Sequence, residues 1–369
     1  LCRRALLHRA RPAPQIGSAL MTAIDTGSIV TVRHQREAKA RRVTIGLVLA
    51  LLVASAAALT LGDYPVPPEE IVRSLFSPFT GLANKGVDFI ILQVRLPRLF
   101  LALLSGTAFG LSGIIFQTLL RNPLASPDII GIAHGASAAA VFCIIVLGWT
   151  GLAVSLGGFA GALLTAFAIY LLAWRNGVTA YRVVLIGIGT AAMLSAVISY
   201  LFTRARLFEV QQAMAWLVGS LNAARPGDSF VLAAMLVVTV PLLIVLARGL
   251  DGLELGDDTA HALGTRVEQT RLGLMVTGVA LAAFATAAVG PVGFVAFVSG
   301  PIARRLMGGA GRGIPQAGLV GALVMLVSDL LAQHALPNMQ LPTGVVTGGF
   351  GAAFLLWLLI VSGRSGRVN

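Results

Sequence analysis

The sequence predicts an all-α polytopic membrane protein with about ten transmembrane helices. Hydrophobic residues make up 57% of its 369 residues and charged residues only 11%, whereas soluble domains carry about 25% charged residues. The apolar residues form long continuous runs along the whole chain. A transmembrane barrel would instead alternate apolar and polar residues over segments of about ten residues. The runs therefore favour helices, each of which needs about 20 apolar residues to cross a bilayer.

Ten apolar runs mark the expected spans. The Gly290-Pro291 pair separates the seventh from the eighth, because residues 272–303 contain no charge and are too many for one span. Proline ends a helix and glycine permits the turn. The runs cover residues 43–61, 99–119, 129–147, 152–173, 183–202, 230–248, 271–289, 292–307, 316–333 and 345–362.

The positive charges predict the domain boundaries and the orientation. Residues 1–42 form a basic tail, 43–362 the transmembrane domain and 363–369 a short C-terminal tail; the residues before Met21 are expected to be a start-site artefact. With ten spans, 20 of the 27 Lys and Arg lie on the side of the termini and seven on the other side. Because Lys and Arg gather in cytoplasmic loops, both termini are predicted to be cytoplasmic. The net charge of +12 then needs no nucleic-acid partner.

Glycines spaced four residues apart occur in three of the runs. This spacing lets helix backbones approach closely, so it predicts a compact bundle and by itself no function. The pairs are Gly106 and Gly110, Gly157 and Gly161, and Gly344 and Gly348.

The sequence holds no P-loop for nucleotides. That loop needs Gly-Lys followed by Ser or Thr, but the only lysines, Lys39 and Lys85, are followed by Ala and Gly. No clustered His, Cys or paired acids lie in the spans, so a membrane enzyme is the weakest interpretation and no metal or cofactor is expected. Cys2 and Cys143 support neither a disulfide framework nor a zinc site. If ATP drives transport, another polypeptide hydrolyses it.

One acidic residue, Asp329, lies clearly inside an apolar run. Ionisable residues deep in spans are typical of proton-coupled transporters, so a secondary transporter that uses Asp329 is the alternative interpretation. Hydrogen bonds from nearby Ser or backbone groups would explain the same residue without a function.

Two arginines precede the second span, on the side of the membrane opposite to the two termini. Arg95 and Arg98 flank Pro97, which stiffens the segment, and they run against the charge bias. Guanidinium groups that point outward there would suit a carboxylate-bearing partner. Snorkelling to lipid headgroups is the other interpretation.

The segment after the second span is expected to be a helix stop, a tight turn and a restart. It begins with Arg121, Asn122 and Pro123, and Ser126 would cap the next helix, with Asp128 in its first turn.

The stretch between Gly249 and Arg271 combines polar and apolar residues in a short helical pattern. Such a segment could lie in the membrane interface or bind a cytoplasmic partner, and its acids disfavour anionic lipid. Its candidate residues are Leu253, Leu255, Gly256, Asp257, Asp258, Ala260, Leu263 and Gly264.

Five blocks in order resemble the FecCD family of ABC-importer permeases for iron-siderophores and cobalamin. The likeness runs from about residue 45 to the C-terminus. The blocks are Arg-Leu-Pro-Arg at 95–98, Gly113 to Gln117 with Arg-Asn-Pro-Leu-Ala at 121–125, Gly256 to Gly264, Gly290 and Pro291 through Arg305, and the turn at Leu341, Pro342, Thr343 and Gly344.

The resemblance implies a type II importer permease with ten helices in a bacterial inner membrane. It implies a second permease, identical or paralogous, two cytoplasmic ATPases that bind ATP and Mg, and an extracytoplasmic siderophore-binding protein. Arg95 and Arg98 match arginines that dock the binding protein, and 256–264 matches the coupling helix that docks the ATPase. Residues 333–340 lack a further outer arginine that relatives can carry. The Ser-Gly-Pro at 299–301 resembles the second permease of catecholate-siderophore systems. The chelate itself is left open.

Overall fold

The structure is a computed structural model that describes residues 26–62, 64–80, 85–175, 179–222, 224, 226–254, 256–262, 264–308, 313–336 and 339–365. These ranges are helical, with short connections. The helices are α2 (Thr26–Thr60), α3 (Pro68–Thr80), α4 (Lys85–Asp88), the π-helix η1 (Phe89–Arg95), α5 (Leu96–Leu119), α6 (Ile132–Ile145), α7 (Leu152–Ala173), α8 (Ala180–Arg204), α9 (Leu207–Val218), α10 (Pro226–Glu254), α11 (Asp257–Ala262), α12 (Val267–Val289), α13 (Val295–Met307), α14 (Ile314–His334) and α15 (Thr343–Ser365).

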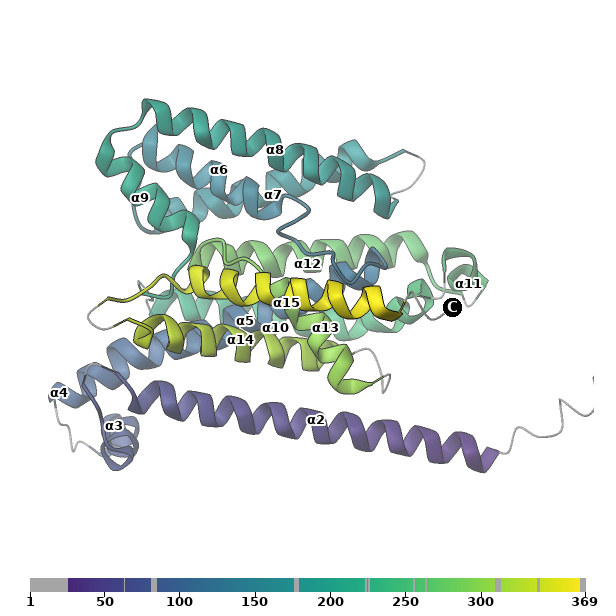
Figure 1. Ribbon diagram of the computed structural model, residues 1–369, viewed down its shortest axis with the longest axis horizontal. Helices are drawn as coiled ribbons and strands as arrows, with labels where there is room; N and C mark the ends of the chain where they lie inside the picture. The colour runs from purple at the N-terminus through teal and green to yellow at the C-terminus, as the bar shows by residue number, and fades with distance from the viewer. Residues whose placement is uncertain are drawn as a thin grey trace, which may run out of the picture.

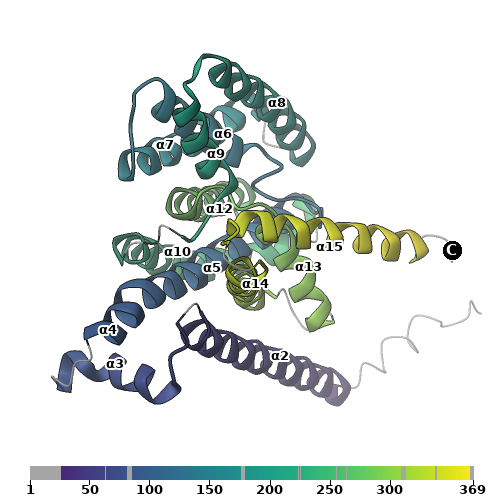
Figure 2. The same ribbon diagram turned by 60° about the vertical axis from the view of Figure 1, so that its left-hand side comes forward.

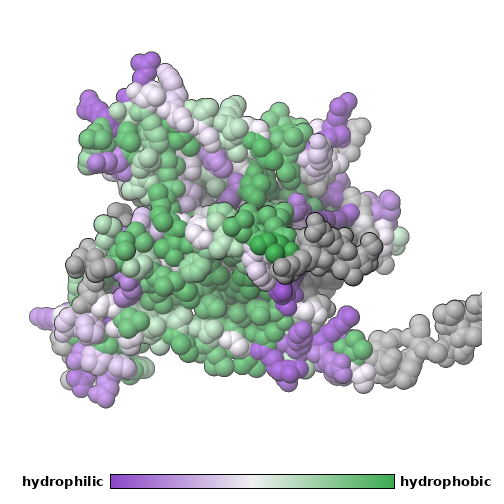
Figure 3. Space-filling view, viewed as in Figure 1, coloured by the Kyte–Doolittle hydropathy of each residue, from purple (hydrophilic) through white to green (hydrophobic). Residues whose placement is uncertain are grey.

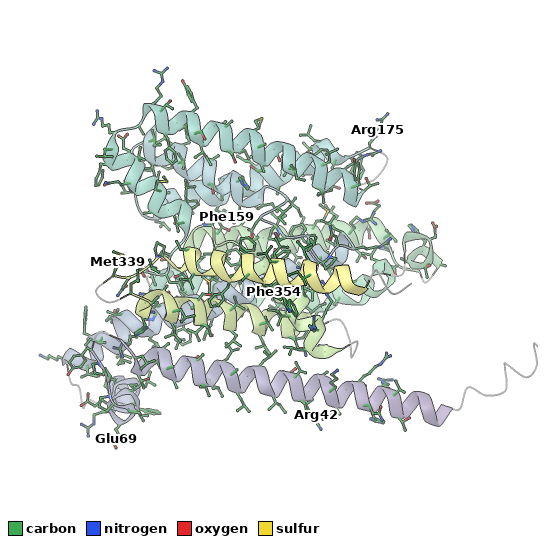
Figure 4. All side chains as sticks on the ribbon, in the orientation of Figure 1. Arg42, Glu69, Phe159, Arg175, Met339 and Phe354 are labelled. Carbon is green, nitrogen blue, oxygen red and sulfur yellow. The ribbon has the colours of Figure 1, made fainter. Side chains whose placement is uncertain are left out.

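The helices form a main body and a smaller unit stacked on it (Figure 1). Helix α5 lies at the centre of the body and packs against α10, α12, α13 and α14. Helices α6 to α9 form the smaller unit, which meets the body mainly through contacts of α6 and α7 with α12 and also through a smaller contact of α9 with α15. Phe159 of α7 and Phe284 of α12 mark this contact, with ring centroids 4.4 Å apart (Figure 4). Helix α2 covers the far flank of α14.

The expected spans all fall on helices. Eight helical segments of the described chain are long and apolar enough to cross a membrane: α2, the α4–η1–α5 rod, α7, α8, α10, α12, α14 and α15. The other two expected spans fall on α6 and α13, which have 14 and 13 residues. At 1.5 Å per residue these helices are only about 20 Å long. They cover only part of the hydrocarbon core.

Several helix boundaries differ from those expected. The predicted break at Gly290-Pro291 is confirmed, because α12 ends at Val289 and α13 begins at Val295. The second span, however, begins upstream at Lys85, so Arg95 and Arg98 lie within a helical rod. Helix α2 begins at Thr26, inside the expected tail. Helices α3 and α9 follow no expected run, because they are short and mix polar with apolar residues.

Both termini of the described chain lie at one end of the bundle, called here the terminus end (Figure 1). Helix α11 lies at this end as well, while α3, α4 and α9 lie at the opposite end. In Figure 4, Arg42 and Arg175 lie at the terminus end, and Glu69 and Met339 at the opposite end. Hydrophilic residues gather at the two ends and an apolar surface lies between them (Figure 3). A bilayer-spanning bundle needs this arrangement.

Glycine permits the closest helix contacts. A Cβ atom on Gly106 would overlap the carbonyl oxygen of Gly321, and one on Gly110 would overlap that of Ala317. Helices α5 and α14 therefore touch backbone to backbone, as the spacing predicted. The pair at 157 and 161 likewise faces α6. The third pair differs, because nothing lies within 4 Å of a Cβ at Gly348.

Three helices have little cover within the chain. In the most apolar stretches of α2 and α8 only 11% of residues are buried, and in α15 only 17%, against 78% in the α4–η1–α5 rod. Figure 2 shows α15 projecting from the body. These faces are left for lipid or for another protein subunit.

Candidate functional site

A buried ion pair lies toward the opposite end of the bundle. Arg98, at the start of α5, donates from Nε to Oδ2 of Asp329 at 2.8 Å and from Nη2 to Oδ1 at 2.9 Å. The side chain of Asp329 is 3% exposed and that of Arg98 14% exposed. Two parallel N–H···O bonds of this kind are the strong, directional form of an ion pair.

Asp329 also accepts hydrogen bonds from Thr343 at the start of α15 and from Gln333 on its own helix, each at 2.8 Å. Arg98 further donates to Oδ1 of Asn222, in the connection from α9 to α10, at 2.7 Å. One ion pair thus joins four segments. The expected serine and backbone donors to Asp329 were wrong, because the main donor is an arginine 231 residues away.

Arg95, the last residue of η1, is held in a different way. Its guanidinium donates to the carbonyl oxygens of Leu59, in the last turn of α2, and of Tyr64, in the connection from α2 to α3. A side chain on Gly62 would meet this guanidinium, so glycine leaves room for it. The expectation that both guanidinium groups serve an outer partner stays a prediction, but Arg95 and Arg98 already use N–H groups on acceptors of this chain.

Three connections meet beside the ion pair. Ser220 donates its N–H to the carbonyl of Val289 at 2.8 Å, and Gly344 donates to that of Gly219 at 3.1 Å. Gly290 has φ 78°, and a Cβ atom there would lie 2.7 Å from the carbonyl oxygen of Trp216. Only glycine suits that position.

The prolines of these two motifs flank the same junction. The carbonyl of Pro291 lies against Gly219, and that of Pro342 accepts from Val345 in the first turn of α15 at 3.1 Å. A cavity of about 410 Å³ opens beside them between α6, α7, α9 and α12. The lining is largely apolar, with polar side chains from Ser155, Gln212, Ser220, Asn222 and Asp228.

Helix α11 protrudes at the terminus end between α10 and α12. Glycines flank it at Gly256 and Gly264, with φ values of 111° and 79°. Ala260 and Leu253 are buried and face the bundle. The surface outside consists of Asp258, Thr259, His261, Ala262 and Gly264. Asp257 is the first residue of α11, and Leu255 and Leu263 lie outside the described residues.

The connection from α5 to α6 approaches the same region. Arg121, with φ 48°, donates from Nε and Nη2 to the carbonyl oxygen of Leu253 at 3.1 and 2.6 Å. Asn122 accepts the N–H of Leu124 at 2.9 Å, which shapes the turn through Pro123. Sequence reasoning placed Arg121 in a turn but gave no sign of its partner.

The helix restart comes later than expected. Ser126 does accept the N–H of Ile129, at 3.4 Å, but this turn ends at Gly131, whose φ is 94°. Helix α6 begins at Ile132.

Burial raises the pKa of Asp128 to about 7, and a hydrogen bond from the backbone of Phe294 acts against that rise.

The two blocks of α5 and α13 that carry the family resemblance pack on each other. Gln117 donates to the carbonyl of Phe297 at 3.0 Å and accepts from Nη2 of Arg304 at 2.6 Å. A Cβ atom on Gly300 would overlap the Gln117 side chain. Glycine at position 300 therefore lets α13 seat on α5.

The architecture is that of a membrane-spanning transport subunit. It combines a polytopic helical bundle, no P-loop in the sequence, and a short helix presented at the terminus end. The model of the FecCD transport family matches residues 48–361. The chain belongs to this family: it is the permease subunit of an ABC importer, and its ATPase is a partner subunit.

Relatives of known function match along nearly the whole chain. The ferric enterobactin transport system permease protein FepG of Escherichia coli K12 is 40% identical over 318 residues, covering 86% of this chain and 95% of the relative. The achromobactin transport system permease protein CbrC of Dickeya dadantii is also 40% identical, over 85% of this chain and 89% of the relative. A solved inward-facing conformation of a metal-chelate type ABC transporter superposes with a TM-score of 0.76 at 24% identity, covering 87% and 99% of the two chains.

Removing one partner of the Arg98–Asp329 ion pair is predicted to destabilise the protein. Asp329→Ala leaves Arg98 buried without its counter-charge, which costs about 3–5 kcal/mol, so the thermal midpoint of the purified protein in detergent should fall clearly. Replacing both residues, as in Arg98→Met with Asp329→Leu, should cost less than the single change. The matched control is Glu37→Ala, which breaks an exposed pair between Arg33 and Glu37 worth ~0–1 kcal/mol. Equal midpoints for Asp329→Ala and Glu37→Ala would contradict the role of the buried pair.

Proposed function

We propose that this permease carries a ferric siderophore across the cytoplasmic membrane, with ferric enterobactin as the first cargo to test. One observation carries the proposal: 40% identity along 95% of a permease named for ferric enterobactin transport. The buried Arg98–Asp329 pair argues against the proton-coupled alternative. Its carboxylate already has donors from three side chains and is satisfied as a charged acceptor.

The class of ABC importer permeases indicates which proteins this chain works with. As an ABC importer permease, the chain works with an ATPase and a binding protein. We further propose that it pairs with a second permease, identical or paralogous, and that the cargo passes between the two. The uncovered faces of α8 and α15 offer surface for such a contact. We propose that α11 docks the ATPase, since it protrudes between two glycines at the end that carries the basic loops.

Transport should depend on ATP and on α11. The complete assembly in proteoliposomes should accumulate labelled ferric enterobactin when ATP is supplied, and a protonophore should leave uptake unchanged. Ala262→Asp places a charge on the exposed face of α11 and should abolish uptake and ATPase pull-down while membrane insertion persists. Arg42→Asp, exposed on α2 at the same end, is the matched control. Uptake that requires a proton gradient but no ATP would overturn the proposal.

The terminus end is proposed to be cytoplasmic, because most Lys and Arg lie there. Single cysteines in place of Glu69 or Met339, in a background without Cys2 and Cys143, should react with an impermeant maleimide in intact spheroplasts. Cysteines in place of Arg175 or Thr259 should react only after permeabilisation. Labelling in the reverse order would refute this orientation.

We also retain docking of the binding protein as a proposal for Arg95 and Arg98. Because Arg98→Ala alone would leave Asp329 unpaired, the test uses Arg98→Met with Asp329→Leu, with and without Arg95→Ala. Capture of the loaded binding protein should weaken about fivefold per lost contact, the effect of ~1 kcal/mol. Rising salt should narrow the gap to the unchanged protein, because exposed charges are screened. Unchanged capture by the triple variant would leave both arginines a structural role only.

A further inference from the structure

The smaller unit is joined to the body by two chain crossovers. One, at residues 120–131, leads from α5 to α6; the other, from residue 219, leads from α9 to α10. The Arg98–Asp329 pair fastens the second crossover through Asn222. The first carries the Arg-Asn-Pro-Leu-Ala block, to which neither docking nor cargo binding assigns a role.

Arg121 connects this first crossover to the last turn of α10. Two of its N–H groups converge on the carbonyl oxygen of Leu253. Leu253 is 3% exposed and lies three residues before Gly256, after which α11 begins. The carbonyl of Leu253 lies in the last turn of α10, where a donor within the helix is missing; it accepts the N–H of Gly256 at 3.4 Å, and a cation is favoured at this negative end. Arg121 therefore caps the element from which α11 projects.

The crossover is rigidly built beyond Arg121. Ala125 donates its N–H to the carbonyl of Asn122 at 3.0 Å, and Asn122 donates to that of Gln117 at 3.0 Å. Pro123 and Pro127 each fix one backbone torsion. Ala125 and Ser126 are buried. These bonds and the two prolines restrict how far the crossover can deform when Arg121 moves.

The far end of the crossover bears directly on α8. A Cβ atom on Gly187 would lie 2.5 Å from the carbonyl oxygen of Ile130, and one on Gly131 would lie 3.0 Å from that of Gly187. The two backbones touch with no side chain between them. Within the described residues, the main helix contacts of α8 are with α6 and α7 of the same unit. A contiguous path thus runs from the base of α11, through Arg121, to α8.

We infer that Arg121 is a positioning residue that couples α11 to α8, so that motion of the ATPase at α11 reaches the smaller unit through the Leu253 carbonyl. This inference rests on the proposed docking of the ATPase at α11. Without Arg121 the ATPase still binds, because the exposed residues of α11 are unchanged. Hydrolysis then continues, but less of it is converted into transport.

The test compares Arg121→Ala, Arg121→Lys and the control Arg42→Ala, an exposed arginine at the same end that donates a hydrogen bond to the carbonyl of Ala38 within α2. The complete assembly in proteoliposomes gives three readouts: ATPase retained on the permease, stimulation of hydrolysis by the binding protein, and cargo imported per ATP. Arg121→Ala should keep the ATPase but lower import per ATP about tenfold, within the usual range of coupling between sites. Arg121→Lys should recover part of the loss, because it keeps the charge but lacks the planar fork. Arg42→Ala should match the unchanged protein.

Two results would overturn the inference. One is import per ATP at the normal level in Arg121→Ala. The other is loss of ATPase binding together with import in both Arg121→Ala and Arg121→Lys, which would make Arg121 a requirement for folding alone. Failure of the unchanged assembly to import ferric enterobactin would instead count against the proposed cargo, and stimulation by the binding protein would still report the effect of Arg121.

Discussion

The buried pair of Arg98 and Asp329 is the interaction on which one end of this molecule depends. Taking two charges out of water costs several kcal/mol per ion unless geometry and further hydrogen bonds compensate. Here the pair is bidentate, and Gln333, Thr343 and Asn222 supply the remaining bonds. Because these partners belong to different segments, satisfying the charges fixes where α5, α14, α15 and the second crossover meet.

In the middle of the bundle, close contacts between helix backbones fix the positions of the helices, as the ion pair does at one end. Lipid tails are as apolar as the helices, so packing between helices, and not water exclusion, holds them together in a membrane. Gly106 and Gly110 let α5 touch α14 directly, and Gly300 makes room for Gln117 between α5 and α13. Central α5 is thereby fixed on several sides, while α8 and α15 remain largely uncovered.

Arginines hold the two crossovers at opposite ends of the bundle. A permease without its own nucleotide site must receive motion at one surface and use it elsewhere. At the terminus end, Arg121 binds the chain beside α11; at the opposite end, Arg98 binds the chain beside α9 and α15. The smaller unit of α6 to α9 is held between these points.

The sequence by itself determined the all-helical membrane class, the approximate spans, the break at Gly290-Pro291 and the absence of a P-loop. These follow from local properties: run length, charge placement, and the turn chemistry of glycine and proline. It also singled out Arg98 and Arg121 through their family blocks, Asp329 through its charge in an apolar run, and Leu253 through the short helical pattern between Gly249 and Arg271.

Only the tertiary structure decided which of these residues bind each other. Arg98 and Asp329 are 231 residues apart, and Arg121 and Leu253 are 132 apart. No periodicity or spacing in one sequence encodes such a distance. The same holds for the short helices α6 and α13, whose ends depend on the positive φ of Gly131 and Phe294 and on the neighbours that stabilise them. A charged side chain in an apolar run indicates that it has a partner. Which residue that partner is depends on how the helices pack.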